Sequence, residues 1–358
     1  MKPVYINGRF LSQRTTGVQR YAVELVRALD ALLVTKESSR RGFILLIPPG
    51  ASSLPTLHHV ESRTVGSLRG QAWEQLELPR YARGGVCLNL CNTAPLLGSS
   101  MLVAIHDAGV FAVPDTYSRP FKLWYQFLHP RLGRSAAVII TVSEFSRREI
   151  ERYAGIPLDK ITVIPNGGEH ILSVHPDGDI LTRLGLTQRY ILAVSSQSPH
   201  KNVQGLLAAL QHLQRRDFEL VLAGGSNPKI FRRAEAEQGA ATLAGYVSDA
   251  ELRTLYEHAE CFVYPSLYEG FGLPPLEAMT CGCPVVVSRA ASLPEVCGDA
   301  AVYCDPRDPR DIATAITMVL EDPALQDDLR RRGKERAAQY TWGRAARSLL
   351  GLLDTLPA

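Results

Sequence analysis

Two glutamates lie on either side of a segment rich in glycine and proline. Glu269 and Glu277 are separated by the residues Gly-Phe-Gly-Leu-Pro-Pro-Leu. The apolar run Cys261–Tyr264 before them predicts a buried strand, and Pro274 or Pro275 predicts the first turn of a helix, where the missing N–H of proline costs nothing. A loop that ends at a helix N-terminus presents free backbone amides, so this segment predicts an anion site.

The same segment has groups that suit a phosphate and the hydroxyls of a sugar. Gly270 and Gly272 allow the backbone to approach a phosphate or a sugar closely. Glu277, about one turn into the helix, is placed to accept hydrogen bonds from two vicinal hydroxyls of a ribose, and Glu269 is placed to meet the sugar. The predicted anion-binding loop consists of Gly270, Phe271, Gly272 and Leu273.

Further candidate residues follow other predicted strands. Lys201 comes after the apolar run Tyr190–Val194, and His106 and Asp107 come directly after Met101–Ile105. Because parallel sheets bind ligands at the carboxyl ends of their strands, these positions predict ligand contacts. A lysine ammonium in such a place is a compact cation that suits a diphosphate.

The segments that must position these residues alternate between strands and helices. Short apolar runs predict strands, and amphipathic segments of helical length follow them, which is typical of a mostly parallel sheet with helices on both faces. This pattern occurs twice along the chain. The predicted strands are Val4–Ile6, Phe43–Ile47, Met101–Ile105, Val138–Val142, Ile161–Ile164, Tyr190–Val194, Glu219–Ala223, Cys261–Tyr264 and Val285–Val287, and the predicted helices include Val18–Leu33, Phe145–Tyr153, Val203–Leu213 and Asp249–Ala259.

A turn-rich cluster separates the two halves. Pro165-Asn166-Gly167-Gly168 follows a predicted strand, so we predict an α/β fold of two doubly wound domains, residues 1–168 and 169–343. Near the end, Tyr340-Thr341-Trp342-Gly343 interrupts the helical pattern, which resumes at Arg344. We therefore expect a separate final helix at about residues 344–358.

The glutamate pair and its loop resemble the Glu-x7-Glu motif of the retaining family-4 glycosyltransferases of GT-B fold. The segments Thr16 to Tyr21 and Tyr190 to Asn202 resemble other parts of the same family, so the likeness runs from end to end of the chain. It implies two Rossmann-like domains facing across a cleft, the first binding the acceptor and the second binding the nucleotide sugar. It also implies that the final helix packs back on the first domain.

The resemblance implies a metal-independent hexosyltransferase that retains anomeric configuration. The first expected donor is GDP-mannose and the second is a UDP-hexose. The expected acceptor is a lipid-linked glycan or a polysaccharide in cell-surface glycan synthesis, such as that of lipopolysaccharide. No cofactor is expected besides the nucleotide sugar as co-substrate, and closure of the two domains is expected to complete the site and exclude water.

The resemblance also assigns roles to individual residues. Lys201 is expected to neutralise the donor diphosphate, and Ser195 and Ser196 stand where many relatives have an arginine, with His200 as a partial replacement. The catalytic residues so implied are Glu269, His106 and Lys201. Donor binding adds Gly17, Ser196, Gly245, Tyr246, Val247 and Glu277 to the loop from Gly270 to Leu273. The acceptor-binding residues are Gln19, Arg20, Asp107 and Ser143, of which Ser143 suits a helix N-cap equally well.

Composition and targeting signals fit a globular enzyme. The 358 residues are 46% hydrophobic and 21% charged, no apolar run is long enough to cross a bilayer, and the N-terminus does not resemble a secretory signal. A cytoplasmic location is therefore expected. The seven cysteines lack paired Cys-x-x-Cys spacing, and Cys281-Gly-Cys283 has no second half-site, so we expect reduced thiols and no bound metal.

Charge is distributed unevenly along the chain. Residues 1–172 contain 20 Lys and Arg against 13 Asp and Glu, which suits an anionic partner. Residues 119–134 mix aromatic side chains with arginine and lysine. This segment predicts either a helix that lies on the anionic inner face of the cytoplasmic membrane or one that buries its aromatic side chains on the sheet. Nucleic acid is not expected as a partner.

Two other classes of function share this frame. A nucleotide-sugar epimerase or a phosphorylase has the same kind of fold, since function depends on the site rather than on the fold. Turnover without an acceptor, or a strict need for inorganic phosphate, selects these enzymes. A non-catalytic nucleotide-sugar binding module is expected to bind the donor without turnover, and the combination of Lys201, Glu269 and Glu277 argues against it.

Overall fold

The computed structural model describes residues 2–34, 41–51, 56–98, 100–195, 198–213, 217–225 and 241–356. The chain divides into two compact units. Unit 1 contains Met1–Asn166 and Trp342–Ala358, and unit 2 contains Gly167–Thr341. Unit 2 thus begins within the predicted turn cluster, at Gly167.

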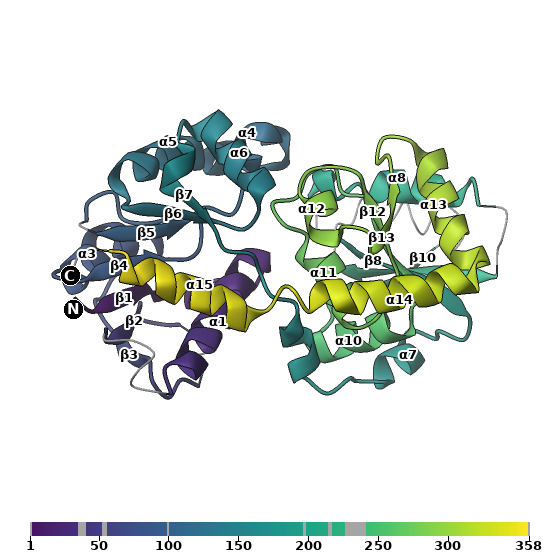
Figure 1. Ribbon diagram of the computed structural model, residues 1–358, viewed down its shortest axis with the longest axis horizontal. Helices are drawn as coiled ribbons and strands as arrows, with labels where there is room; N and C mark the ends of the chain where they lie inside the picture. Colours follow the sequence, from purple (N-terminus) through teal and green to yellow (C-terminus); the bar gives the residue numbers. More distant parts are fainter. Residues whose placement is uncertain are drawn as a thin grey trace. The chain divides into compact units, whose positions relative to one another are not determined.

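Unit 1 is built on a parallel sheet of seven strands in the order β3-β2-β1-β4-β5-β6-β7 (Figure 1). Its strands are β1 (Val4–Asn7), β2 (Phe43–Ile47), β3 (Glu61–Thr64), β4 (Val86–Asn89), β5 (Met101–Ala104), β6 (Val138–Thr141) and β7 (Ile161–Val163). Its helices are α1 (Gly17–Leu32), α2 (Gly70–Ala72), α3 (Leu78–Tyr81), α4 (Gly109–Ala112), α5 (Arg119–Ser135), α6 (Glu144–Ala154) and α15 (Trp342–Asp354).

Burial explains one of the two strands of unit 1 that the prediction missed. Every residue of β4 and β5 is buried, as expected for strands covered by helices on both faces, whereas every residue of the polar edge strand β3 is exposed. An edge strand that faces solvent has no apolar pattern. The prediction accordingly missed β3, and it also missed the four-residue β4.

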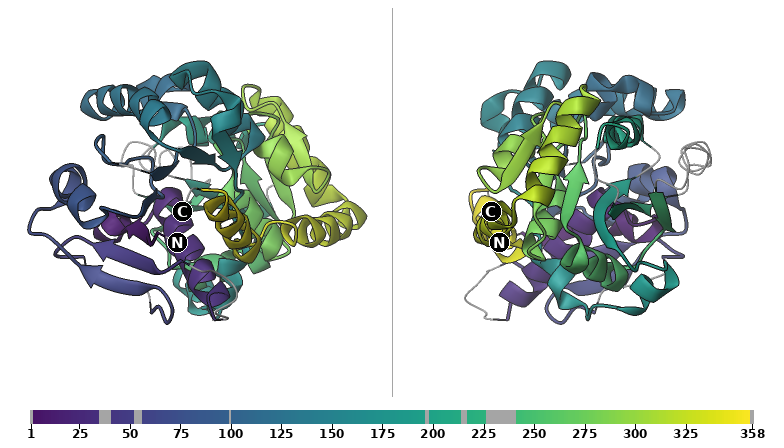
Figure 2. Two further views of the ribbon diagram at one scale, coloured as in Figure 1. Left: turned by 60° about the vertical axis from the view of Figure 1, so that its left-hand side comes forward. Right: turned by 90° about the vertical axis from the view of Figure 1, so that its right-hand side faces the viewer.

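The last helix of the chain belongs to unit 1 (Figures 1 and 2). α15 packs along α1, and the Tyr21 and Trp342 rings meet edge to face with centroids 5.9 Å apart. The helix begins at Trp342 rather than at the predicted Arg344. The Trp342 side chain is buried in this contact, which stabilises the helical conformation at that residue and explains the earlier start.

Unit 2 is built on a parallel sheet of six strands in the order β10-β9-β8-β11-β12-β13. Its strands are β8 (Arg189–Ser195), β9 (Phe218–Gly224), β10 (Ala241–Gly245), β11 (Cys261–Tyr264), β12 (Val285–Ser288) and β13 (Ala301–Cys304). Its helices are α7 (Asp179–Arg183), α8 (Val203–Leu210), α10 (Asp249–His258), α11 (Leu273–Thr280), α12 (Leu293–Cys297), α13 (Pro309–Glu321) and α14 (Pro323–Ala337).

Both sheets reverse their strand order next to their first strand. In unit 1, β1 lies between β2 and β4, and in unit 2, β8 lies between β9 and β11. Doubly wound sheets bind ligands outside the carboxyl ends of the strands at such a switch point. The predicted fold class, two Rossmann-like α/β domains, is confirmed.

Candidate functional site

The switch point of unit 2 brings a lysine and a glutamate together. Lys201 ends a short 3-10 helix (Pro199–Lys201) after β8, and Glu269 lies in the loop after the neighbouring strand β11. The Lys201 Nζ is 2.7 Å from Glu269 Oε1 and 2.9 Å from Oε2, and it donates to the Tyr264 hydroxyl at 2.6 Å. Two predicted catalytic residues, 68 positions apart in sequence, therefore form one ion pair.

The surroundings of Glu269 keep its carboxyl group ionised. Burial acts to raise its pKa, but the Lys201 charge and hydrogen bonds from Lys201 and Ser266 outweigh burial, so the pKa is lowered. The Ser266 hydroxyl donates to Glu269 Oε1 at 2.6 Å. At neutral pH this carboxylate accepts hydrogen bonds or stabilises positive charge, and it is not a proton donor.

Serine hydroxyls hold the loop that contains Glu269. Ser292 Oγ donates to the carbonyl oxygens of Glu269 and Phe271, both at 2.9 Å. The Ser266 Oγ is 2.9 Å from the His200 carbonyl oxygen, and the Ser288 hydroxyl donates to the Ser266 carbonyl. The loops after β8, β11 and β12 are thus fastened to one another, which fixes the site before any ligand binds.

The loop after Glu269 ends on α11 in the predicted way. Gly272 has φ 103°, a conformation that glycine adopts without strain, and an added Cβ would lie 2.6 Å from Leu293 Cδ2. Pro274 and Pro275 lack N–H groups. Among the described residues, no acceptor contacts the amides of Phe271, Gly272 and Leu273. These three consecutive donors next to Lys201 suit an anionic ligand.

Glu277 lies in α11 and is buried, with two donors on its carboxylate. His170 Nε2 is 2.9 Å from Glu277 Oε1, and the Tyr256 hydroxyl is 3.3 Å from Oε2. Sequence reasoning missed both partners. His170 follows Gly167-Gly168 at the start of unit 2. The sequence indicated this segment only as a linker between domains and not as part of a site.

The remaining predicted donor contacts lie at the end of β10. Gly245 is the last residue of β10 and has φ 66°, and Tyr246 after it is 67% exposed. An exposed ring beside open backbone suits the stacking of a nucleobase. Val247 follows in the connection to α10. The predicted contact Ser196 lies outside the described residues.

His106 of unit 1 is buried directly after β5. Its Nε2 lies 2.9 Å from the Leu90 carbonyl oxygen. The rings of His106 and Tyr21 are nearly perpendicular, with their centroids 4.6 Å apart. Burial lowers the pKa of His106 to about 4. The ring is therefore neutral at physiological pH, with its proton on Nε2.

The candidate acceptor residues have structural contacts of their own. Gln19 Oε1 accepts from the Thr16 amide at 3.2 Å, and Arg20 lies 3.5 Å from Glu24 on the next turn of α1. Asp107 Oδ1 accepts from the Gly109 amide at 2.7 Å. Ser143 Oγ accepts from the Ser146 amide at 3.0 Å, so Ser143 is the N-cap of α6.

Gly17 begins α1 in an open position. Gly17 is exposed, and a Cβ added to it would have no atom within 4 Å beyond its own helix and its chain neighbours. The absence of a side chain here is therefore not required by packing, and it leaves the start of α1 open to a ligand.

The sequence matches known glycosyltransferases in both units. Residues 85–169 match the family Glycosyltransferase Family 4, and residues 182–336 match Glycosyl transferases group 1. The O-antigen chain mannosyltransferase B of Escherichia coli is 32% identical to this chain, and the match covers 91% of the chain and 93% of that protein. The chain is a family 4 glycosyltransferase.

Other relatives of this glycosyltransferase agree in length and fold. The O-antigen chain mannosyltransferase RfbU of Salmonella typhimurium is 25% identical, over 89% of this chain and 91% of that protein. The structure of Anabaena HepE in complex with UDP-glucose has a TM-score of 0.75 at 16% identity, covers 99% of this chain and all of that one, and shows the shared fold. The predicted family is confirmed.

Sequence reasoning missed a second buried ion pair in the glycosyltransferase, which lies in unit 1. Arg9 follows β1, and its Nε donates to Glu74 Oε1 at 3.1 Å. The same oxygen accepts from Asn7 Nδ2 at 2.7 Å and from the Thr93 hydroxyl at 2.9 Å. A glutamate in a helix 65 positions away gives no sequence signal for such a partner.

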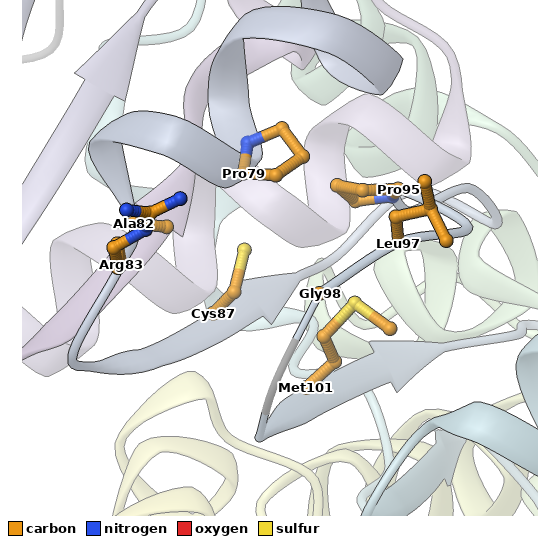
Figure 3. A pocket seen from close by; sticks show the side chains of 8 residues that line it. All are labelled: Pro79, Ala82, Arg83, Cys87, Pro95, Leu97, Gly98 and Met101. Atoms are coloured by element: carbon orange, nitrogen blue, oxygen red, sulfur yellow. The ribbon is translucent and has the colours of Figure 1, made fainter.

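Two cavities in the structure are lined by none of the predicted site residues. One, of about 220 Å³, is lined in unit 1 by the Cys87 and Met101 side chains of adjacent strands, with Pro79 and Leu97 opposite (Figure 3). The other, of about 520 Å³, lies in unit 2 between β9 and α13. The residues predicted to bind the donor in unit 2 lie instead after the carboxyl ends of β8, β10 and β11 and in α11.

The cysteines are unpaired thiols. The seven cysteines are free, and burial raises the pKa of Cys281 to about 12, so this thiol is not reactive. No group of His, Cys, Asp or Glu with the arrangement of a metal site occurs in the part of the chain that the structure describes. None of the described helices combines the length and the apolar character needed to span a membrane.

Proposed function

We propose that this glycosyltransferase transfers mannose from GDP-mannose to a lipid-linked or polysaccharide acceptor, with retention of configuration and without a metal. The single observation that carries the proposal is the Lys201–Glu269 pair, followed along the loop by the amides of Phe271 to Leu273, which no acceptor contacts among the described residues. The choice of mannose rests on the similarity to two O-antigen chain mannosyltransferases. A UDP-hexose is the second candidate donor.

The proposed chemistry requires stabilisation of the leaving diphosphate. The bond between the anomeric carbon and the phosphate oxygen breaks, and the diphosphate leaves with the electron pair. The acceptor hydroxyl oxygen bonds to the anomeric carbon on the same face, and its proton passes to the departing phosphate oxygen. Lys201 and the amides of Phe271 to Leu273 stabilise the charge that develops on the diphosphate.

The carboxylates and the histidine have separate roles in this proposal. Ionised Glu269 accepts hydrogen bonds from the sugar and stabilises positive charge at the anomeric carbon. Glu277 accepts hydrogen bonds from the ribose hydroxyls, and Tyr246 forms a wall for the base. The neutral ring of His106 positions the transferred sugar and does not act as a strong base, because burial lowers its pKa to about 4.

A donor panel with the full chain tests the proposal. We expect GDP release from GDP-mannose in the presence of acceptor, little release from UDP-glucose, and an α-configured product from the α-configured donor by proton NMR. Addition of EDTA is expected to leave the rate unchanged. Inversion, or activity that EDTA abolishes and a divalent ion restores, would contradict the mechanism. Turnover of the donor without any acceptor would select the epimerase class.

We also propose that α5 attaches the enzyme to an anionic lipid bilayer. One face of the helix buries Leu128, His129 and Leu132, whereas Phe121, Leu123 and Phe127 are 41%, 65% and 42% exposed. Residues 119–135 mix apolar and aromatic side chains with three arginines and one lysine, and they include no acidic residue. This charge complements acidic headgroups.

Vesicle sedimentation of the full chain tests this attachment. We expect binding to vesicles of phosphatidylcholine with phosphatidylglycerol and weak binding to phosphatidylcholine alone. The double variant Leu123→Ser, Phe127→Ser is expected to lose binding, and the exposed Met318→Ser of unit 2 serves as the matched control. Equal binding to both kinds of vesicle, or undiminished binding of the double variant, would refute the proposal.

A further inference from the structure

The carboxylate of Glu277 is held from two sides within unit 2. His170 Nε2 lies 2.9 Å from Oε1, and the Tyr256 hydroxyl lies 3.3 Å from Oε2. The three side chains are buried, and only 3% of the His170 side chain is exposed. The carboxylate thus has one donor on each oxygen.

The backbone that supplies His170 is fixed against α11, the helix of Glu277. An added Cβ at Gly168 would lie 2.6 Å from Thr280 Oγ1 and 2.9 Å from Leu276 Cγ, so this segment packs directly on α11. The Ser173 hydroxyl donates to the His170 carbonyl at 2.6 Å and closes the turn that follows. His170 is therefore a rigid donor rather than a mobile side chain.

A glutamate needs such partners to present a defined face. Its terminal torsion is broad and has no strongly preferred rotamer, so hydrogen bonds must set the plane of the carboxylate. An ionised carboxylate has about four acceptor positions, of which His170 and Tyr256 occupy two. One acceptor position then remains on each oxygen, which matches two vicinal hydroxyls.

We propose that His170 and Tyr256 are positioning residues that orient Glu277 for the ribose of the donor nucleotide. The inference rests on the proposed function, because it takes Glu277 as the ribose-binding group. In this arrangement the Nε2 of His170 carries the proton that it donates. Tyr256 also remains a donor, since burial and then the Glu277 charge raise its pKa well above the ordinary value.

Binding of ribonucleotide and deoxyribonucleotide to the full chain separates positioning from mere structural support. We expect the wild type to bind GDP about 10-fold more tightly than 2′-deoxy-GDP, the loss of one charge-assisted hydrogen bond. His170→Ala is expected to reduce this ratio to near 1 by weakening GDP alone, since phosphate contacts are shared by both ligands. His170→Gln, which places an amide donor near the Nε2 position, is expected to restore much of the ratio. The pair UDP and 2′-deoxy-UDP is measured in parallel.

Two further variants keep the test decisive. Tyr256→Phe removes only the hydroxyl and keeps the ring, so it is expected to fold and to reduce the ratio by a smaller factor even where His170→Ala does not fold. His175→Ala, an exposed histidine five positions along the chain, is the control and is expected to keep the ratio. A wild type that binds both nucleotides equally would refute the ribose role of Glu277 itself. The positioning role alone would be refuted if the wild type discriminates and the variants keep the full ratio. These variants are His170→Gln, Tyr256→Phe and any folded His170→Ala protein.

Discussion

The sheets of the two units share the order of six strands, to which unit 1 adds β7. In each unit a basic residue after the first strand pairs with a glutamate. In unit 1, Arg9 pairs with Glu74, and the two side chains are 8% and 1% exposed. In unit 2, Lys201 pairs with Glu269, and the exposures are 18% and 11%. Glu74 Oε1 also accepts from Asn7 and Thr93, so the first pair is enclosed by its own unit, whereas the second pair is more exposed and is followed by amides that no acceptor contacts among the described residues. We therefore propose that the same position of the fold supports stability in one unit and ligand binding in the other.

The largest expected effect breaks the enclosed pair. Arg9→Ala leaves the Glu74 carboxylate buried without its charge partner, which should cost about 3–5 kcal/mol of the free energy of unfolding of unit 1. All three tryptophans, Trp73, Trp124 and Trp342, lie in unit 1, so tryptophan fluorescence during urea denaturation reports on that unit. The control is Arg63→Ala, whose ion pair with Glu61 is solvent-exposed. Equal midpoints for Arg9→Ala and the control would contradict the structural role.

The open pair is expected to affect turnover more than folding. Lys201→Ala removes a charge aimed at the leaving diphosphate, and loss of one such stabilising group lowers kcat by about 100- to 1000-fold. Initial rates with GDP-mannose measure this loss, and the exposed Lys334→Ala is the matched control. A Lys201→Ala enzyme that folds and retains most of its kcat would show that the lysine does not act on the diphosphate.

We expect the buried histidines of unit 1 to make its stability depend on pH. His106 and His129 each have a pKa lowered by burial to about 4, below the ordinary value of about 6.5. Between these values the unfolded chain binds more protons, so the free energy of unfolding falls as the pH falls. At pH 5 we expect a loss of about 2 kcal/mol per histidine relative to pH 7, measured by tryptophan fluorescence. His106→Gln is expected to make this dependence shallower, and an unchanged slope would contradict the assignment.

A smaller effect is expected from the serine that supports the donor loop. Ser292→Ala removes both hydrogen bonds to the carbonyls of Glu269 and Phe271, which should weaken the loop by about 1–3 kcal/mol and raise the KM for the donor more than it lowers kcat. Thr314→Ala on α13, whose hydroxyl contacts only its own helix, is the control. An unchanged KM for Ser292→Ala would indicate that the loop is held by other contacts.

The comparison also explains what the sequence predicts and what it leaves hidden. The alternation of apolar runs and helices predicts both sheets, because buried parallel strands are apolar along their whole length. The loop from Glu269 to Glu277 can be predicted from the sequence because its functional residues are neighbours along the chain. His170 and Glu277 are 107 positions apart, and Asn7 and Glu74 are 67 apart, so their contacts arise only when the sheets assemble. Polar β3 and the capping role of Gln19 likewise depend on local geometry that residue type alone does not reveal.

Calorimetric titration of GDP into the full chain tests the central claim, that unit 2 holds the donor nucleotide through Lys201 and Glu277. Loss of a charge-assisted hydrogen bond costs about 1.5–3 kcal/mol, so Lys201→Ala and Glu277→Ala are each expected to raise the Kd for GDP by at least about 10-fold. His106→Gln, a change in unit 1 at a residue assigned to the sugar, is expected to leave the Kd for GDP unchanged. An unchanged Kd in folded Lys201→Ala and Glu277→Ala proteins, or an equal loss in His106→Gln, would contradict the account.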